Sequence, residues 1–177
     1  MKVLERIGPA LGDLAARSTT SQEGTLVLEI EAKDAHEAVQ GLRDACGFET
    51  CTFVTAVDRF PMEPRFEVSW QLHSLQHNER VRVRARVPGS AARVPTVVDL
   101  YPGAAFSERE CFDMFGIVFE GHAGLKRLLM PEGYEHFPLR KDFPHQGIEP
   151  DRLYREWDER RHLRARNAST SGAEAAS

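Results

Sequence analysis

Residues 66–87 read FEVSWQLHSLQHNERVRVRARV and contain two alternating segments joined by a polar turn. Apolar residues occupy every second position, namely Phe66, Val68, Trp70 and Leu72 in the first segment and Val81, Val83, Ala85 and Val87 in the second. This period-2 pattern is typical of strands with one buried face, and the turn at residues 76–78 joins them. The stretch therefore predicts an antiparallel β-hairpin.

The other side of the second segment is basic, because Arg80, Arg82, Arg84 and Arg86 alternate with its apolar residues. Like charges about 7 Å apart along a strand need solvent or an acidic partner. We favour a solvated edge face that prevents strand-to-strand aggregation, with an interaction surface as the alternative.

Further elements are predicted before the hairpin. Residues 3–14 have helical apolar spacing interrupted by Gly8 and Pro9, which predicts one kinked or two short helices. Residues 25–31 alternate as a half-buried strand. A helix then runs from a capping box at Asp34 and Glu37 to a stop at Gly47. Residues 48–57 are apolar on both faces, so we expect a strand at the centre of the sheet.

After the hairpin, Ser107 and Glu110 form an S-x-x-E capping box, and Gly116 is placed to end the short helix that they begin. On this helix Glu108 lies near the positive end, and Arg109 can pair with Asp113 four positions later. Phe112 and Phe115 can anchor the helix to the sheet or to a partner.

The predicted fold class is α+β, a two-layer sandwich of a mixed β-sheet with helices on one face, followed by an extended C-terminal arm. Residues 1–118 form the compact domain. Residues 119–166 are rich in glycine and proline but too apolar for a disordered linker, so we expect an arm that binds a partner. Residues 167–177 are small and polar and are expected to be disordered.

Composition excludes several classes of protein. The chain has 177 residues, a net charge of -4 and a pI of about 6.0, which argues against nucleic acid as a partner. The sequence contains no run of about 20 apolar residues, the length that a membrane-spanning helix needs, so we expect a soluble protein made in the cytoplasm. The three cysteines contain no C-x-x-C pair, which predicts reduced, mostly buried thiols rather than disulfides, zinc or iron-sulfur ligands.

A catalytic interpretation could start from Glu108, Glu110, Asp113 and His122 as an acid/base or metal cluster. Glu108 and Glu110 are two positions apart, so on a helix they point to different sides. His122 has no partner at H-E-x-x-H spacing, and the sequence contains neither G-x-G-x-x-G nor a P-loop. We therefore expect no catalytic, cofactor-binding or metal-binding residue in this chain.

Two charged blocks form a specific signature. It comprises Glu108, Arg109, Glu110, Asp113, Phe115 and Gly116, then His122 and Arg127, then Pro138, Leu139, Arg140, Lys141, Asp142, Phe143 and Pro144. This arrangement closely resembles the C subunit of NADH-quinone oxidoreductase, respiratory complex I. Arg140, Lys141 and Asp142 offer adjacent charges on an extended backbone, and we predict inter-subunit salt bridges there.

The resemblance implies a non-catalytic scaffold in the hydrophilic arm of a proton-translocating complex, supporting electron transfer from NADH to quinone. The expected partners are the large quinone-site subunit and adjacent iron-sulfur subunits. NADH, FMN, iron-sulfur clusters and quinone belong to the whole complex, and none to this chain. The implied location is the cytoplasmic side of the bacterial inner membrane, reached only through the complex. The alternatives are the equivalent subunit of a membrane-bound hydrogenase or another dehydrogenase, or a free-standing protein-binding module.

Overall fold

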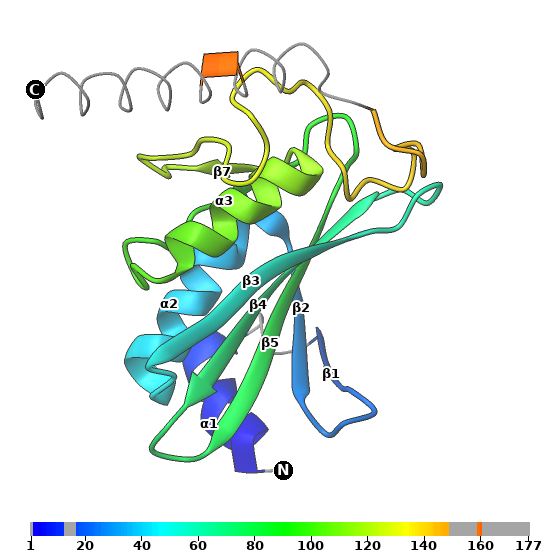
Figure 1. Cartoon of the computed structure of the whole chain (residues 1–177). Coiled ribbons are helices and arrows are strands. Elements are labelled where there is room, and N and C mark those ends of the chain that lie inside the picture. Colours follow the sequence, from blue (N-terminus) through cyan, green and yellow to red (C-terminus); the bar gives the residue numbers. More distant parts are fainter. Residues whose placement is uncertain (1, 13–16, 149–158, 161–177) are drawn as a thin grey trace, which may run out of the picture.

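The computed structural model describes residues 2–12, 17–148, 159 and 160. Its N-terminal elements are α1 (Lys2–Leu11), β1 (Ser18–Thr20), β2 (Leu26–Ile30), the 3-10 helix η2 (Ala32–Asp34) and α2 (Ala35–Cys46). These are followed by β3 (Thr50–Asp58), β4 (Phe66–Ser74), β5 (Glu79–Val87), β6 (Arg93–Pro95), α3 (Ala104–Phe115) and β7 (Val118–Glu120). Figure 1 shows α1, α2 and α3 stacked along one side of the main sheet.

The main sheet has five strands in the order β1-β2-β5-β4-β3. The predicted hairpin is β4–β5, whose antiparallel register pairs Phe66 with Val87 and Ser74 with Glu79. β2 runs parallel to β5, whereas the other neighbours are antiparallel, so the sheet is mixed. The predicted α+β class with a mixed sheet is therefore confirmed. β6 and β7, which the sequence did not predict, form a separate parallel pair.

The central position predicted for residues 48–57 is wrong, because β3 lies at the edge of the sheet and β5 occupies the centre. β3 buries Val54 and Ala56 on one face, but Phe53 and Val57 on its other face are 40% and 42% exposed. Two apolar faces therefore do not mean two covered faces here. The edge position expected for the arginine-rich strand is also wrong, because β5 lies between β2 and β4.

Both predicted glycine stops are confirmed, because Gly47 and Gly116 adopt left-handed conformations after α2 and α3. Both capping boxes are wrong. Asp34 ends a 3-10 turn and makes no side-chain cap, and its backbone is not extended as an N-cap requires. α3 begins at Ala104 because a bond from its N–H to the Tyr101 carbonyl already turns the chain before Ser107.

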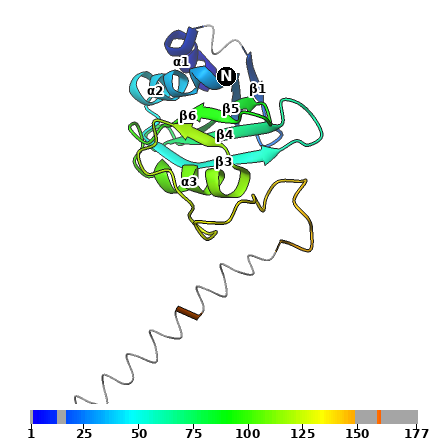
Figure 2. The same cartoon turned by 90° about the horizontal axis from the view of Figure 1, so that it is seen from above.

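The core lies between the helices and one face of the sheet. The largest fully buried side chains come from the helices, the sheet and the connections between them, and include Ile7, Leu28, Leu42, Phe48, Phe66 and Trp70. Figure 2 shows α1 and α2 on the side of β5 and α3 beside β3. Burying one such side chain contributes about 1.5–3 kcal/mol, so this layer provides much of the stability of the fold.

Two of the three cysteines lie in this core. Cys46 and Cys111 are buried, Cys51 is half-buried and all three are free thiols, as the sequence predicted. Of the opening segment, residues 2–11 form one helix that contains Pro9, whereas Leu14 lies outside the described residues. The end of the predicted arm and the tail at 167–177 also lie outside the described residues, apart from positions 159 and 160.

Candidate functional site

The signature residues meet where α3 packs against the loop that follows β7, and Asp113 is the centre of this contact. Its fully buried carboxylate accepts the backbone N–H groups of Leu128, Leu129 and Met130 at 3.0, 2.6 and 2.9 Å. Nη1 of Arg127 lies 2.9 Å from the other carboxylate oxygen and 2.7 Å from the Asp113 carbonyl oxygen. One aspartate therefore fixes the direction of a loop that has no regular structure.

Arg127 continues this network. Its second Nη donates to the Tyr134 carbonyl, and its guanidinium lies over the Phe137 ring at 4.8 Å. The guanidinium of Arg140 lies over the same ring at 4.3 Å, and its Nε donates to the Phe115 carbonyl at 2.7 Å. Phe137 thus takes part in two cation–π contacts that connect the two signature blocks.

Gly116 lets these groups approach the end of α3. Its φ is +75°, and a Cβ there would lie 2.6 Å from Arg140 Nη2 and 2.7 Å from the Phe137 ring. Glycine is required here both by backbone conformation and by the lack of space for a side chain.

A second ionic cluster attaches residues 138–144 to the sheet. Arg65 donates Nε and Nη2 to Asp58 at 2.9 and 2.7 Å, and Nη1 and Nη2 to Asp142 at 2.9 and 2.7 Å. The N–H of Lys141 donates to Asp58 Oδ2 at 2.8 Å. One guanidinium thus holds two carboxylates in bidentate geometry, the strongest kind of charge-assisted contact.

Glu108 is fully buried on the opposite side of α3. It accepts the hydroxyl of Thr96 at 2.5 Å and the N–H of Val97 at 2.8 Å, which attaches the segment after β6 to the helix. His122 lies nearby, with Nε2 3.2 Å from the Ala105 carbonyl oxygen and Nδ1 accepting the Gly124 N–H at 3.0 Å. These contacts fit a ring whose Nε2 donates to the Ala105 carbonyl while Nδ1 accepts the Gly124 N–H.

Burial raises the pKa of each buried carboxylate in this region, and the hydrogen-bond donors around it decide the direction of the net shift. Burial opposes ionisation of Asp113, but its three backbone donors and Arg127 outweigh it and lower the pKa. Burial likewise opposes ionisation of Asp58, and Arg65 with two backbone donors lowers its pKa to about 2. The pKa of Asp142 is lowered by Arg65. Burial dominates at Glu108 and raises its pKa.

The structure separates two residues that the sequence paired. Arg109 does not bond to Asp113 but donates to the carbonyls of Lys126 and Arg127 at 3.3 and 2.9 Å. The predicted pair is wrong because Asp113 faces the loop, whose backbone donors and Arg127 occupy its oxygens.

The remaining signature residues divide by exposure. Phe115 is buried and forms an edge contact with Phe66, with ring centroids 6.3 Å apart. Half-buried positions are Pro138, Arg140 and Phe143, and exposed positions are Glu110, Leu139, Lys141, Asp142 and Pro144. The inter-subunit salt bridges expected at Arg140, Lys141 and Asp142 stay a prediction, and within this chain Asp142 pairs with Arg65.

Sequence reasoning missed Asp58, Arg65, Thr96 and Phe137. Arg65 and Asp142 are 77 positions apart, and no local spacing connects them. The only sequence signal was indirect, since the charges at 140–142 needed partners that the segment itself does not provide.

The carboxylates of this site make structural contacts within the chain. Asp58, Asp113 and Glu108 bind backbone donors or neighbouring side chains. Among the described residues, no group of three or more His, Cys, Asp or Glu side chains could hold a metal ion. No helix in the described part of the chain is long and apolar enough to cross a membrane.

Large apolar side chains surround the network on the surface. Phe106 is 65% exposed, Leu129 63% and Leu139 53%. Three exposed apolar side chains around a polar network are typical of a protein-binding surface.

Comparisons with known proteins agree with this signature. Residues 28–149 match the family model described as respiratory-chain NADH dehydrogenase, 30 Kd subunit. The C subunit of NADH-quinone oxidoreductase from Salinispora tropica is 38% identical over 148 residues, which cover 82% of this chain and 60% of that protein. The C subunit from Methylobacterium radiotolerans is 41% identical over 146 residues, which cover 81% of this chain and 67% of that protein.

Two solved structures share the fold. A trypsin-resistant fragment of Nqo5 is 32% identical with a TM-score of 0.60, covering 68% of this chain and 99% of the fragment. A chain of the membrane-bound sulfane sulfur reductase, an archaeal respiratory membrane complex, is 27% identical with a TM-score of 0.69, covering 82% and 87%. Compared with the curated relatives, this chain matches only part of their length, about 60% of the Salinispora tropica protein. By its sequence match, the chain belongs to the family of the respiratory-chain NADH dehydrogenase 30 Kd subunit.

Proposed function

We propose that the chain is the C subunit of a proton-translocating NADH-quinone oxidoreductase, a scaffold in its hydrophilic arm with no active site of its own. It supports electron transfer from NADH to quinone by docking on the large quinone-site subunit and on adjacent iron-sulfur subunits. NADH, FMN, iron-sulfur clusters and quinone are assigned to other chains. The proposed location is the cytoplasmic side of the inner membrane, through the complex alone.

The observation that carries this proposal is the use of the signature charges. Asp113 and Glu108 bind backbone donors, Arg127 and Arg140 bind carbonyls and an aromatic ring of the same chain, and Asp142 binds Arg65. The carboxylate oxygens in this network are occupied by donors of the same chain, so they are not free to exchange protons with a substrate. The same hydrogen bonds hold a loop without regular structure in one shape. A fixed loop surrounded by exposed Leu129 and Leu139 suits docking.

We propose the division 1–118, 119–166 and 167–177 as compact domain, partner-binding arm and disordered tail. The arm then has two parts. Residues 119–148 pack on the domain through the Asp113 and Arg65 clusters. The remainder is the part expected to lie along a neighbour and to become protected from protease only when that neighbour is present.

The test is affinity purification of the tagged chain from gently solubilised membranes, with co-purifying proteins identified by mass spectrometry and assayed for NADH-quinone reductase activity. An active multi-subunit complex is the expected result. Recovery of the chain alone would contradict the proposal and favour a free-standing binding module. Assembly that is unchanged in both Arg140→Ala and Asp142→Ala would contradict the role given to the second signature block.

A second candidate is the equivalent subunit of another membrane-bound respiratory complex, such as a hydrogenase or a different dehydrogenase. The likeness to a chain of the archaeal sulfane sulfur reductase favours it. The same purification distinguishes the two, because the co-purified catalytic subunits identify the electron donor while the scaffold role is unchanged.

A further inference from the structure

The sheet face opposite the helices carries the arginines of β5 beside apolar residues of β3. The strand register arranges its side chains in rows across the sheet: Phe53, Gln71 and Arg82, then Thr55, Ser69, Arg84 and Glu29, then Val57, Glu67 and Arg86. We call this surface, together with Arg59 and Arg80, the arginine face. The helices of the described chain pack against the other side of the sheet (Figure 1).

On the arginine face, long side chains cover β4, the strand between β3 and β5. Glu67, Ser69 and Gln71 of β4 are 3–6% exposed, although their side chains point away from the helices. Glu67 accepts Arg59 at 3.0 Å and Arg84 at 3.2 Å, and Nε of Arg86 lies 3.6 Å away. One buried carboxylate therefore serves three guanidinium groups.

The arginine face has more cations than its own acids can pair. It carries five arginines against Glu29 and Glu67, a surplus of three positive charges on a chain whose net charge is -4. Nε of Arg59 and of Arg84 is buried without an acceptor among the described residues. The balance of donors and acceptors on this face is therefore incomplete within the described chain.

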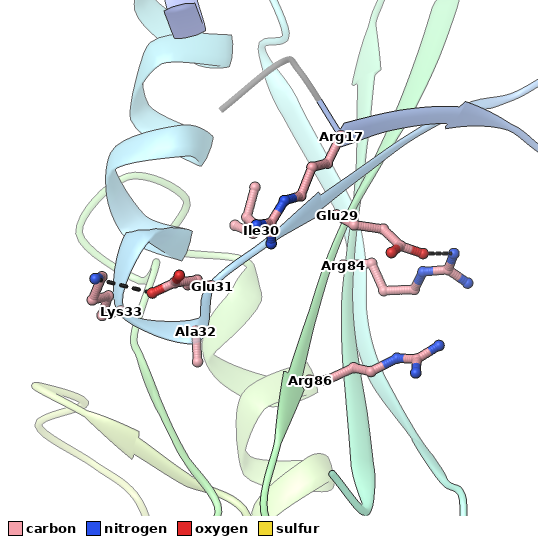
Figure 3. Close-up of a pocket in the computed structure, with 8 residues that line it drawn as sticks. All are labelled: Arg17, Glu29, Ile30, Glu31, Ala32, Lys33, Arg84 and Arg86. Atoms are coloured by element: carbon pink, nitrogen blue, oxygen red, sulfur yellow. Dashed lines mark hydrogen bonds and ion pairs between the residues drawn. The ribbon is translucent and has the colours of Figure 1, made fainter. Parts of the chain in front are cut away.

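One end of the arginine face is hollowed. Figure 3 shows the hollow, of about 460 Å³, with Arg84 turned to Glu29 and Arg86 extending beside it. Arg17 and Lys33 line the same hollow, and Lys33 pairs with Glu31. The cations exceed the acids in this lining by four to two, so the hollow favours a carboxylate or another anion.

Apolar residues flank these charges on the neighbouring strand. Phe53 and Val57 share rows with Arg82 and Arg86, and each is about two-fifths exposed. Aromatic residues and arginine are enriched in protein interfaces, where a small apolar centre excludes water from the surrounding ion pairs. A row of aliphatic and aromatic side chains on a rigid strand fits a protein surface better than a free anion.

We propose that the arginine face docks an acidic, partly apolar strip on a neighbouring subunit of the same assembly. The carboxylates of that strip pair with Arg80, Arg82 and Arg86, and its apolar side chains cover Phe53 and Val57. This inference rests on the proposed function, because it requires an assembly, and it adds a second contact surface on the side of the sheet away from α3.

The test compares Arg82→Glu with Arg93→Glu in the tagged full-length chain, purified from gently solubilised membranes. Among the described residues, Arg82 bonds only the neutral Gln71, whose amide can turn to suit a new neighbour, so reversal leaves no described charge buried and unpaired. Arg93 is an exposed arginine outside the face, with a 3.5 Å contact to Glu120. Arg86→Gln is a second variant that removes charge without placing an acid beside Glu67. Circular dichroism melts establish that all variants fold.

We expect Arg82→Glu to reduce recovery of partner subunits at least about tenfold, Arg86→Gln to reduce it less, and Arg93→Glu to match the wild type. Wild-type recovery of the complex with unchanged recovery by Arg82→Glu and Arg86→Gln would overturn this inference alone. Failure of the wild type to recover any partner would overturn the proposed function and this inference with it.

An acidic lipid surface is the other class that could meet the arginines. The isolated full-length chain is therefore mixed with vesicles containing phosphatidylglycerol and sedimented. Vesicle binding that Arg82→Glu abolishes, while partner recovery stays unchanged, would overturn the docking of a protein strip.

Discussion

The carboxylate of Asp113 and the guanidinium of Arg127 meet at 2.9 Å, and the aspartate side chain is fully buried at the contact. The same carboxylate holds three consecutive backbone N–H groups. The ionised side chain of Asp113 therefore links helix α3 to the loop after β7, and the shape of the exposed surface around Leu129 depends on that charge.

Replacement of Asp113 by asparagine is expected to destabilise the fold by about 3–5 kcal/mol, because it leaves Arg127 without its buried counter-charge. Asparagine keeps the size of the side chain, so the loss reports charge rather than packing. Urea unfolding followed by circular dichroism measures it. Glu110→Gln on the exposed side of the same helix is the control and should change stability by less than about 0.5 kcal/mol. Equal stabilities of the two variants would contradict the central role of Asp113.

Acid should destabilise the protein through the same carboxylates. The folded pKa values of Asp58, Asp113 and Asp142 lie below the unfolded values, so their contribution is complete above the unfolded pKa and is lost as pH falls through the folded pKa. For Asp58 this window runs from about 4 down to about 2. Urea midpoints measured between pH 6 and pH 2 should fall, and Asp113→Asn should show a shallower fall than the wild type. An equally steep fall in that variant would contradict the assignment.

Glu108 should show the opposite sign. Its folded pKa is raised by burial, so its contribution is present below the unfolded pKa and is lost as pH rises through the folded pKa. Glutamine can still accept the N–H of Val97 without the cost of a buried charge, so Glu108→Gln should be neutral or stabilising at pH 7. Glu108→Ala leaves that N–H unpaired and should cost about 1–3 kcal/mol. Thermal melts of both variants decide the matter, and equal losses would contradict the argument.

Gly116 and Gly47 provide a matched pair at the ends of two helices. Both have left-handed φ, near +75° and +66°, but a Cβ on Gly47 meets nothing nearer than 3.9 Å. Gly47→Ala should therefore cost about 1–2 kcal/mol from backbone conformation alone. Gly116→Ala should cost more, because it also displaces Phe137 and Arg140, and the difference between the two free energies of unfolding measures that packing. Equal costs would mean that the loop moves away without penalty.

Arg65→Lys should release residues 138–144 from the sheet. A lysine ammonium cannot hold Asp58 and Asp142 in two bidentate contacts, so we expect a loss of about 1.5–3 kcal/mol. Hydrogen exchange at the Lys141 amide, which bonds Asp58, should become at least tenfold faster. Arg93→Lys changes an exposed pair and should leave that amide unchanged. Unchanged exchange in Arg65→Lys would show that other contacts hold the loop.

The sequence by itself determined the local structure and the family. Period-2 alternation predicted β2, β4 and β5, and glycine predicted the ends of α2 and α3, because these signals act within a few residues. The two signature blocks were sufficient to indicate the family because they combine many residue types at fixed spacing.

Only the tertiary structure decided strand order and the partners of the charges. The sequence placed β3 at the centre because both of its faces are apolar, but strand order depends on which strand the chain inserts between the others. It paired Arg109 with Asp113 because spacing along a helix reveals only the neighbours on that helix. Asp113 instead binds a loop 14 to 17 residues away, and Arg65 binds Asp142, which is 77 residues away. Contacts between distant segments arise from the packing of whole elements, and a local pattern carries no information about them.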